Sequence, residues 1–281
     1  MTAISLSNLL TAFGITFAAG LATVLGSALV FFSKTPSPRV LAFGLAFAGG
    51  AMVYVSLTEI FGKSRDAFVQ ATGEQLGFAY TTFAFLAGVI LVMLIDRLIP
   101  NPHETLDPND KKFKPKNSSQ KIQAKKFKPK NRQHIARIGT MAALAITAHN
   151  FPEGLATFFA TLENPSVGLA LAIAIHNIPE GISIAAPVYF ATQNKKFTVL
   201  MCLLSGLAEP FGAILGYVAL RPFLSPMVFG SVFGVIAGVM VFLALDELLP
   251  AAKRYAEGHE TVYGLVTGMA IMALSLVLFN W

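Results

Sequence analysis

Long apolar runs, separated by short polar connections, dominate the chain. Runs of about 20 apolar residues are long enough to cross a bilayer as helices. Eight such runs occur, at residues 7–32, 39–61, 77–99, 138–161, 166–190, 196–220, 226–250 and 260–281. The first has no basic residue before it and is too long for a signal sequence, so we expect it to be retained. The pattern predicts an all-α polytopic membrane protein with eight transmembrane helices.

The charges refine this picture. Only 13% of residues are charged, against roughly 25% in soluble domains. With the N-terminus outside, only Lys63, Arg65 and Arg221 of the 21 Lys and Arg residues fall on the outer side. The positive-inside rule therefore predicts an N-out, C-out protein of the cytoplasmic (inner) membrane. The net charge of +6 follows from these connections, so we expect the lipid bilayer and not nucleic acid as the partner.

One stretch divides the chain into three regions. Residues 1–99 hold the first three predicted helices, and residues 138–281 hold the other five. Between them, residues 100–137 are rich in Lys, Pro, Asn and Gln, and the heptamer at 111–117 recurs at 125–131. Such a segment buries too little apolar surface to fold alone, so we expect a disordered cytoplasmic loop. Attraction of its lysines to anionic lipid is the alternative role.

A six-residue motif in the apolar sequence occurs twice. Residues 149–154 read His-Asn-Phe-Pro-Glu-Gly, and residues 176–181, 27 residues later, read His-Asn-Ile-Pro-Glu-Gly. A His and a Glu four positions apart lie on one face of a helix. Each motif lies near the centre of its predicted helix, where a charged side chain costs about 2.5–3.5 kcal/mol. Such residues predict a functional site.

The ligand types indicate a divalent metal ion. Glu209 lies at the same depth as the two motif glutamates, so a cation would compensate three neighbouring carboxylates. Nitrogen and oxygen ligands without thiolate suit an exchangeable transition-metal site. We expect Cys202, the single cysteine, to be an apolar core residue. The candidate ligands, enough for two adjacent ions, are His149, Asn150, Glu153, His176, Asn177, Glu180 and Glu209.

Prolines and a second repeat extend the prediction. Each six-residue motif contains a proline, Pro152 or Pro179, and Pro210 directly follows Glu209. We expect these prolines to break their helices beside a cavity. Residues 50–59 also align with 238–247, which belong to helices of opposite direction. Both repeats predict an inverted repeat about an axis in the membrane plane, a common plan of transporters.

The residues resemble a known family. The doubled motif, the Ser-Gly-Leu-Ala-Glu stretch at 205–209 and the Asp-Glu-Leu-Leu-Pro sequence at 246–250 resemble the ZIP (Zrt/Irt-like) metal transporters, especially their bacterial branch. The resemblance implies a binuclear centre. His149, Glu153, His176 and Glu180 would form its main site, and the glutamates would bridge to a second site completed by Asn150, Asn177 and Glu209.

The resemblance also implies how such a protein works. Family members move metal toward the cytosol, often as homodimers, and their motif helices slide as a unit against a scaffold. Two departures are visible. Many relatives carry Asp or His at the position of Asn177, and many eukaryotic relatives have a His-rich loop where this chain is Lys-rich.

We therefore expect uptake of divalent metal ions without a catalytic cofactor. Zinc and iron(II) are the expected ions, with manganese, cobalt and cadmium as further candidates. Glu59 either lines the entry path or is an interfacial charge. A passive metal channel differs only in mechanism. An intramembrane zinc hydrolase is disfavoured because the chain has no His-Glu-x-x-His run.

Overall fold

The computed structural model describes residues 5–32, 38–98, 147, 150–162 and 167–279. Regular secondary structure in these residues is entirely helical. In chain order the elements are α1 (Leu6–Phe32), α2 (Pro38–Val55), η1 (Ser56–Ile60), α3 (Phe61–Thr72), α4 (Glu74–Leu98), the helical residues 150–162, α6 (Val167–Thr192), α7 (Lys195–Leu220), η3 (Arg221–Phe223), α8 (Pro226–Leu243), η4 (Ala244–Leu248), α9 (Leu249–Tyr255) and α10 (Glu260–Phe279).

The predicted membrane helices are confirmed in part. Six helices of the described residues are long and apolar enough to cross a membrane. Two further predicted spans correspond to the helical residues 150–162 and to α6. Residues 138–146 and the loop 100–137 lie outside the described residues. The chain is therefore an all-helical, multi-span membrane protein.

Two predicted helix ends were wrong. The second predicted helix, 39–61, continues through η1 and α3 to Thr72, and the seventh, 226–250, continues through η4 and α9 to Tyr255. The apolar pattern stops early because the extensions carry charges such as Lys63 and Asp66. The α3 extension is nevertheless helical because it packs against α4 and α8.

Both long helices contain one π-helical turn. The turn η1 lies at Ser56–Ile60 and η4 at Ala244–Leu248. These are the same positions in the two segments, 50–59 and 238–247, that align in sequence. A π-turn adds one residue to a helical turn and is often found at functional sites.

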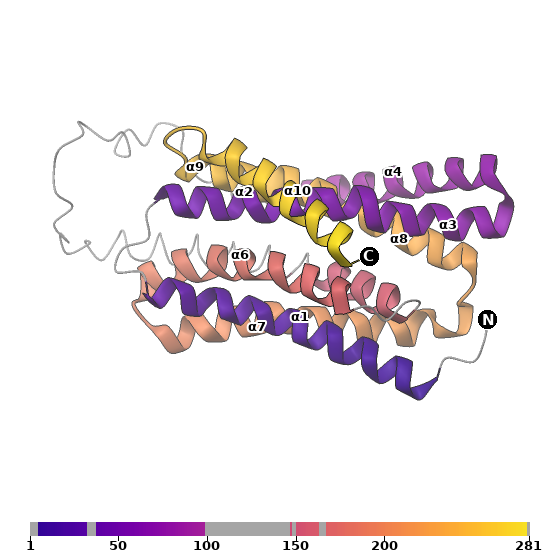
Figure 1. Ribbon diagram of the computed structural model, residues 1–281, viewed down its shortest axis with the longest axis horizontal. Coiled ribbons are helices and arrows are strands. Elements are labelled where there is room, and N and C mark those ends of the chain that lie inside the picture. The colour runs from indigo at the N-terminus through magenta and orange to yellow at the C-terminus, as the bar shows by residue number, and fades with distance from the viewer. Residues whose placement is uncertain (1–4, 33–37, 99–146, 148–149, 163–166, 280–281) are drawn as a thin grey trace.

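The helices form two groups (Figure 1). Helices α1, α6 and α7 pack on one another in the lower group of the view, while α2, α3, α4, α8, α9 and α10 form the upper group. Contacts of α6 with α2 and α10 join the two groups. The lower group includes both helices that carry Asn177 and Glu209, so it holds the candidate site.

Glycines allow the closest helix contacts. A Cβ on Gly20 of α1 would collide with the carbonyl of Gly206 on α7, and a Cβ on Gly206 would collide with the carbonyl of Gly20. In the other group, Gly50 of α2 meets the backbone of Leu265 on α10 in the same way. Small residues let backbones approach closely where lipid provides no hydrophobic driving force.

The motif prolines do not interrupt their helices. Pro210 lies inside α7, which is α-helical from Lys195 to Leu220, and Pro179 lies inside the continuous α6. Pro152 lies within the helical residues 150–162. The expected breaks at Pro179 and Pro210 were therefore wrong, whereas residues 148–149, just before Pro152, lie outside the described residues. Each proline still lacks an N–H and so removes one intrahelical hydrogen bond, but close packing by neighbouring helices preserves the helical path.

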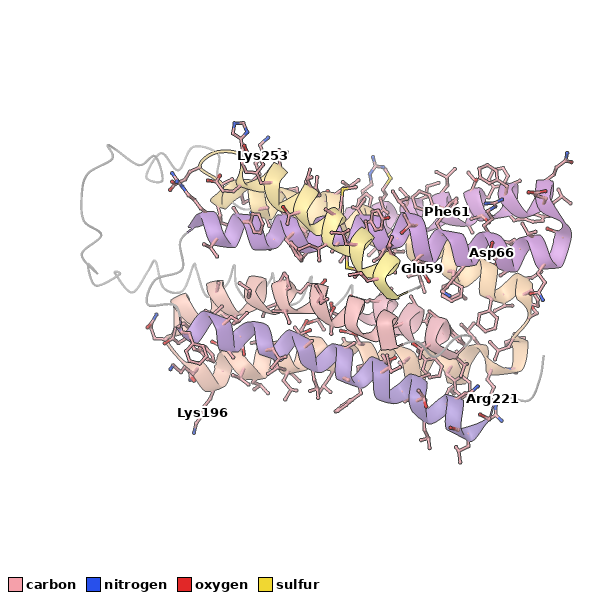
Figure 2. The ribbon with its side chains drawn as sticks, viewed as in Figure 1. Glu59, Phe61, Asp66, Lys196, Arg221 and Lys253 are labelled. Atoms are coloured by element: carbon pink, nitrogen blue, oxygen red, sulfur yellow. The ribbon has the colours of Figure 1, made fainter. Side chains whose placement is uncertain are left out.

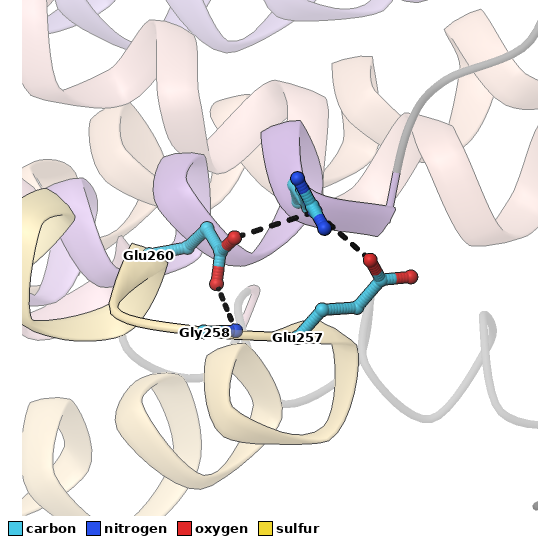
Figure 3. A network of polar contacts seen from close by, with 4 residues as sticks. Glu257, Gly258 and Glu260 are labelled. Atoms are coloured by element: carbon cyan, nitrogen blue, oxygen red, sulfur yellow. Dashed lines mark hydrogen bonds and ion pairs between the residues drawn. The ribbon is translucent and has the colours of Figure 1, made fainter. Parts of the chain in front are cut away.

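Charged side chains mark the ends of the molecule. Figure 2 shows Lys196 and Lys253 near one end and Arg221 toward the other. At the start of α2, Arg39 Nε lies 2.9 Å from Glu257 Oε2 and 3.5 Å from Glu260 Oε1 (Figure 3). The Gly258 amide donates to Glu260 Oε2. This network ties α2 to the turn before α10.

Candidate metal site

Five polar side chains of the predicted site are buried around α7, where α6 and the helical residues 150–162 pack on it. They come from three helices, are at most 2% exposed, and are Asn150, Glu153, Asn177, Glu180 and Glu209. Helix α6 supplies the second motif and α7 supplies Glu209, while residues 150–162 supply the first motif. Buried polar residues at membrane depth are costly and mark functional sites.

Asn177 links three helices through one nitrogen. Its Nδ2 donates to Oε1 of Glu209 at 2.6 Å and to the carbonyl of Ala19 at 2.9 Å. These partners lie on α7 and α1. The amide therefore orients the Glu209 carboxylate, and its own Oδ1 has no hydrogen-bond partner among the described residues.

Asn150 has a parallel arrangement. Its Nδ2 lies 3.2 Å from the Ser205 carbonyl and 3.4 Å from Ser205 Oγ on α7. Its Oδ1 also lacks a described partner. In both motifs, the asparagine nitrogen thus donates to the backbone of a neighbouring helix. The asparagine oxygen is left available to bind another group, such as a metal ion.

The packing that brings these groups together depends on the motif glycines. A Cβ on Gly154 would collide with the backbone of Glu209, and a Cβ on Gly181 would collide with the carbonyl of Thr23. Each glycine directly follows a motif glutamate. The small residue therefore lets α7 or α1 approach the backbone beside Glu153 or Glu180.

The electrostatics of the cluster favour a cation. The Glu209 side chain is completely buried, and the charges of Glu153 and Glu180 repel its carboxylate. Its Oε2 has no hydrogen-bond partner among the described residues. Removal of carboxylates from water is costly unless opposite charge compensates them. The oxygens of Glu209, Asn150 and Asn177 that lack described partners are suited to bind a metal ion. That ion would be a substrate of the protein.

The two motif histidines are predicted ligands whose side chains lie outside the described part of the structure. His149 lies outside the described residues, and for His176 the structure describes the backbone in α6 but not the side chain. Among the side chains that are described, no three His, Cys, Asp or Glu groups lie in metal-holding geometry. The assignment of the histidines as ligands therefore stays a prediction.

Glu59 lies apart from this cluster. It is within η1, in the middle of the long helix from Pro38 to Thr72, and not near a helix end as expected. Its Oε1 lies 3.6 Å from Lys63 Nζ, and its side chain is 29% exposed. Figure 2 shows it between the two ends of the molecule. Cys202 is buried, as expected for a core residue.

A buried polar group beside the site was not predicted from the sequence. Thr23 on α1 is completely buried, and its Oγ1 has no described hydrogen-bond partner. It belongs to no motif. The only signal was its place between Gly20 and Gly26, at the spacing of one helix face.

A buried acidic and amide cluster inside a bundle of membrane helices is characteristic of an ion-translocating membrane protein. The family model described as ZIP zinc transporter matches residues 6–276. The chain belongs to this family, which consists of transporters and not enzymes. The resemblance inferred from the doubled motif is therefore confirmed.

Curated relatives cover the whole chain. A zinc transporter ZupT of Neisseria meningitidis serogroup B is 71% identical over 279 residues, covering 99% of this chain and 98% of the relative. Another, of Xanthomonas axonopodis pv. citri, is 64% identical and covers 100% and 99%. That of Chlorobium chlorochromatii is 46% identical and covers 97% and 99%. The similarity thus supports the bacterial ZupT-like branch.

Proposed function

We propose that this protein takes up zinc across the cytoplasmic membrane toward the cytosol. The observation that carries the proposal is the buried cluster in which the charges of Glu153 and Glu180 repel that of Glu209, while the amide oxygens of Asn150 and Asn177 lack partners among the described residues. Such a cluster needs a cation. The relatives named as zinc transporters support zinc as that cation.

The proposed centre holds two ions. His149, Glu153, His176 and Glu180 form the main position, and Asn150, Asn177 and Glu209 form the second, with the motif glutamates bridging. The hydrogen bond from Asn177 to Glu209 supports the second position, because it orients a carboxylate and an amide oxygen side by side. Carboxylates shared between ions are the usual plan of di-metal helix bundles.

An inverted repeat relates the two halves of the centre. The carbonyl of Ala19 accepts from Asn177, and that of Ser205 accepts from Asn150. Ala19 and Ser205 are separated in sequence by the same interval as Gly20 and Gly206. These matched contacts support a two-fold axis between α1 and α7, at the mutual approach of the two glycines.

The glycine contacts of the two halves are also related by the proposed two-fold axis. Gly26 of α1 meets the carbonyl of Ile178 in the second motif, and Gly212 of α7 meets the carbonyl of Phe151 in the first. The other helix group has its own matched pair. Gly50 of α2 meets Leu265 on α10, and Gly238 of α8 meets Phe85 on α4. The repeat therefore extends over both groups of helices.

The proposed topology is eight helices with both termini outside. The placement of Lys196 and Lys253 at one end of the molecule and of Arg221 toward the other supports it, because basic residues accumulate on the cytoplasmic side. A homodimer in the membrane is part of the proposal. The loop 100–137 then lies in the cytoplasm.

The same ligands accommodate other ions. Imidazole, carboxylate and amide groups bind iron(II), manganese, cobalt and cadmium as well as zinc, and we propose these as further substrates. Glu59, part exposed and paired with Lys63, is proposed for the entry path. Because the ligands must be deprotonated to bind metal, zinc binding weakens in acid.

Zinc uptake into proteoliposomes tests the proposal. The full-length protein is reconstituted, and radioactive zinc entering the vesicles is counted over time. The double variant His149→Ala with His176→Ala is expected to abolish saturable uptake, whereas the exposed His259→Ala control retains it. Unchanged uptake by the double variant would show that the motif histidines do not hold the transported ion.

A further inference from the structure

We propose that the hydroxyl of Thr23 on α1 is an additional oxygen donor to the transported ion, at the position that the inverted repeat relates to Glu209. This inference rests on the proposed function, because it assumes that an ion occupies the cluster. It adds α1, a helix without a sequence motif, to the elements that hold the ion.

The hydrogen bonding of Thr23 is unusual for this protein. Helical threonines ordinarily bond the carbonyl four residues earlier. Eight threonines of the described residues do so, namely Thr16, Thr58, Thr72, Thr81, Thr82, Thr161, Thr192 and Thr198. The Thr23 hydroxyl has no such bond although it is completely buried.

The reason is visible at the carbonyl that Thr23 would use. That carbonyl belongs to Ala19, and it accepts the hydrogen bond of Asn177. The site amide thus occupies the usual partner of the hydroxyl. A buried hydroxyl without a partner is costly, so its presence at this place indicates a ligand that satisfies it.

Thr23 lies against two helices of the site. A Cβ on Gly206 of α7 would lie 3.4 Å from Thr23 Cβ, and Gly181, which follows Glu180, packs on the Thr23 carbonyl. One turn earlier on the same face of α1, a Cβ on Gly20 would lie 3.6 Å from Glu209 Oε1. The threonine therefore lies at the junction of α1, α6 and α7.

In the inverted repeat, Thr23 corresponds to Glu209. Thr23 and Glu209 are separated by the interval that separates Gly20 from Gly206. Their contacts match as well, because Gly154 packs on the backbone of Glu209 as Gly181 packs on that of Thr23. Glu209 accepts from Asn177. The same operation directs the Thr23 hydroxyl toward Asn150, whose Oδ1 also lacks a described partner.

The two related positions differ in charge. Glu209 supplies a carboxylate to one half of the site, and Thr23 supplies a neutral oxygen to the other. A third carboxylate is already repelled by Glu153 and Glu180, and a fourth would increase that repulsion. A neutral donor completes the coordination without holding the ion as tightly, which suits release. Neutral oxygen donors also suit manganese relative to softer ions.

Zinc and manganese binding to the purified full-length protein test the inference. Thr23→Val removes the hydroxyl at nearly constant shape. Its dissociation constant for zinc is expected to rise about tenfold, and that for manganese is expected to rise more. Thr23→Ser retains the hydroxyl and should bind both ions as the wild type does.

Thr16→Val is the matched control. Thr16 is also buried on α1, but its hydroxyl bonds the Ala12 carbonyl at 2.9 Å, so its loss should leave ion affinity unchanged. Wild-type affinity in Thr23→Val, or equal losses in both valine variants, would overturn the role of Thr23. Absence of zinc binding to the wild-type protein would instead overturn the proposed function.

Discussion

Asn177 donates a 2.6 Å hydrogen bond from Nδ2 to Oε1 of Glu209, and the same nitrogen reaches the carbonyl of Ala19 at 2.9 Å. One amide thereby joins α6, α7 and α1 in the interior of the bundle. The arrangement leaves Asn177 Oδ1 and Glu209 Oε2 without described partners. Two oxygens on neighbouring helices are thus oriented and available to an ion.

Replacement of Asn177 tests this link. Asn177→Ala removes the donor of both bonds and leaves a buried carboxylate without it, which should cost about 1–3 kcal/mol. We expect a lower melting temperature of the purified protein in detergent, together with weaker zinc binding. Asn8→Ala, at an exposed position, should change neither. An unchanged melting temperature would contradict a structural role of the amide.

Glu209→Gln separates stability from ion binding. The substitution removes the buried carboxylate that the charges of Glu153 and Glu180 repel, so the metal-free protein should melt at a higher temperature. The increase in melting temperature on addition of zinc should become smaller, because a ligand charge is lost. The control is Glu74→Gln, whose side chain is 83% exposed. An undiminished zinc-induced increase would exclude Glu209 from the site.

The repeat predicts equal effects at two glycines. Gly20→Ala and Gly206→Ala each place a methyl group against the other's carbonyl, and overpacking of this kind costs about 1–3 kcal/mol. Both variants should lower the melting temperature by similar amounts. Gly14→Ala, with nothing within 4 Å of its new Cβ, should not. A large effect at only one of the two glycines would contradict a symmetric contact between α1 and α7.

Hydropathy predicted most of the helices because lipid requires long apolar segments. It placed the second helix end near residue 61 because Lys63 and Asp66 follow, yet contacts with α4 and α8 continue the helix to Thr72. The expected proline breaks failed for a related reason. Helix α7 continues through Pro210, because neighbouring helices in a membrane bundle compensate the backbone groups that a proline frees.

The candidate site could likewise be predicted from the sequence only in part. The doubled motif identified Asn150, Glu153, Asn177 and Glu180, because their types and spacing repeat in the sequence. Thr23 had no repeated pattern around it. Its role emerges only when the contact of α1 with α6 and α7 reveals that the Ala19 carbonyl is already occupied.

Anomalous X-ray scattering from crystals grown with zinc directly tests whether this cluster binds zinc. Data collected on both sides of the zinc absorption edge locate zinc without reference to function. A strong difference peak is expected among the carboxylates of Glu153, Glu180 and Glu209. Zinc found only elsewhere, such as at the Glu257 and Glu260 carboxylates (Figure 3), would contradict the assignment of this cluster as the transport site.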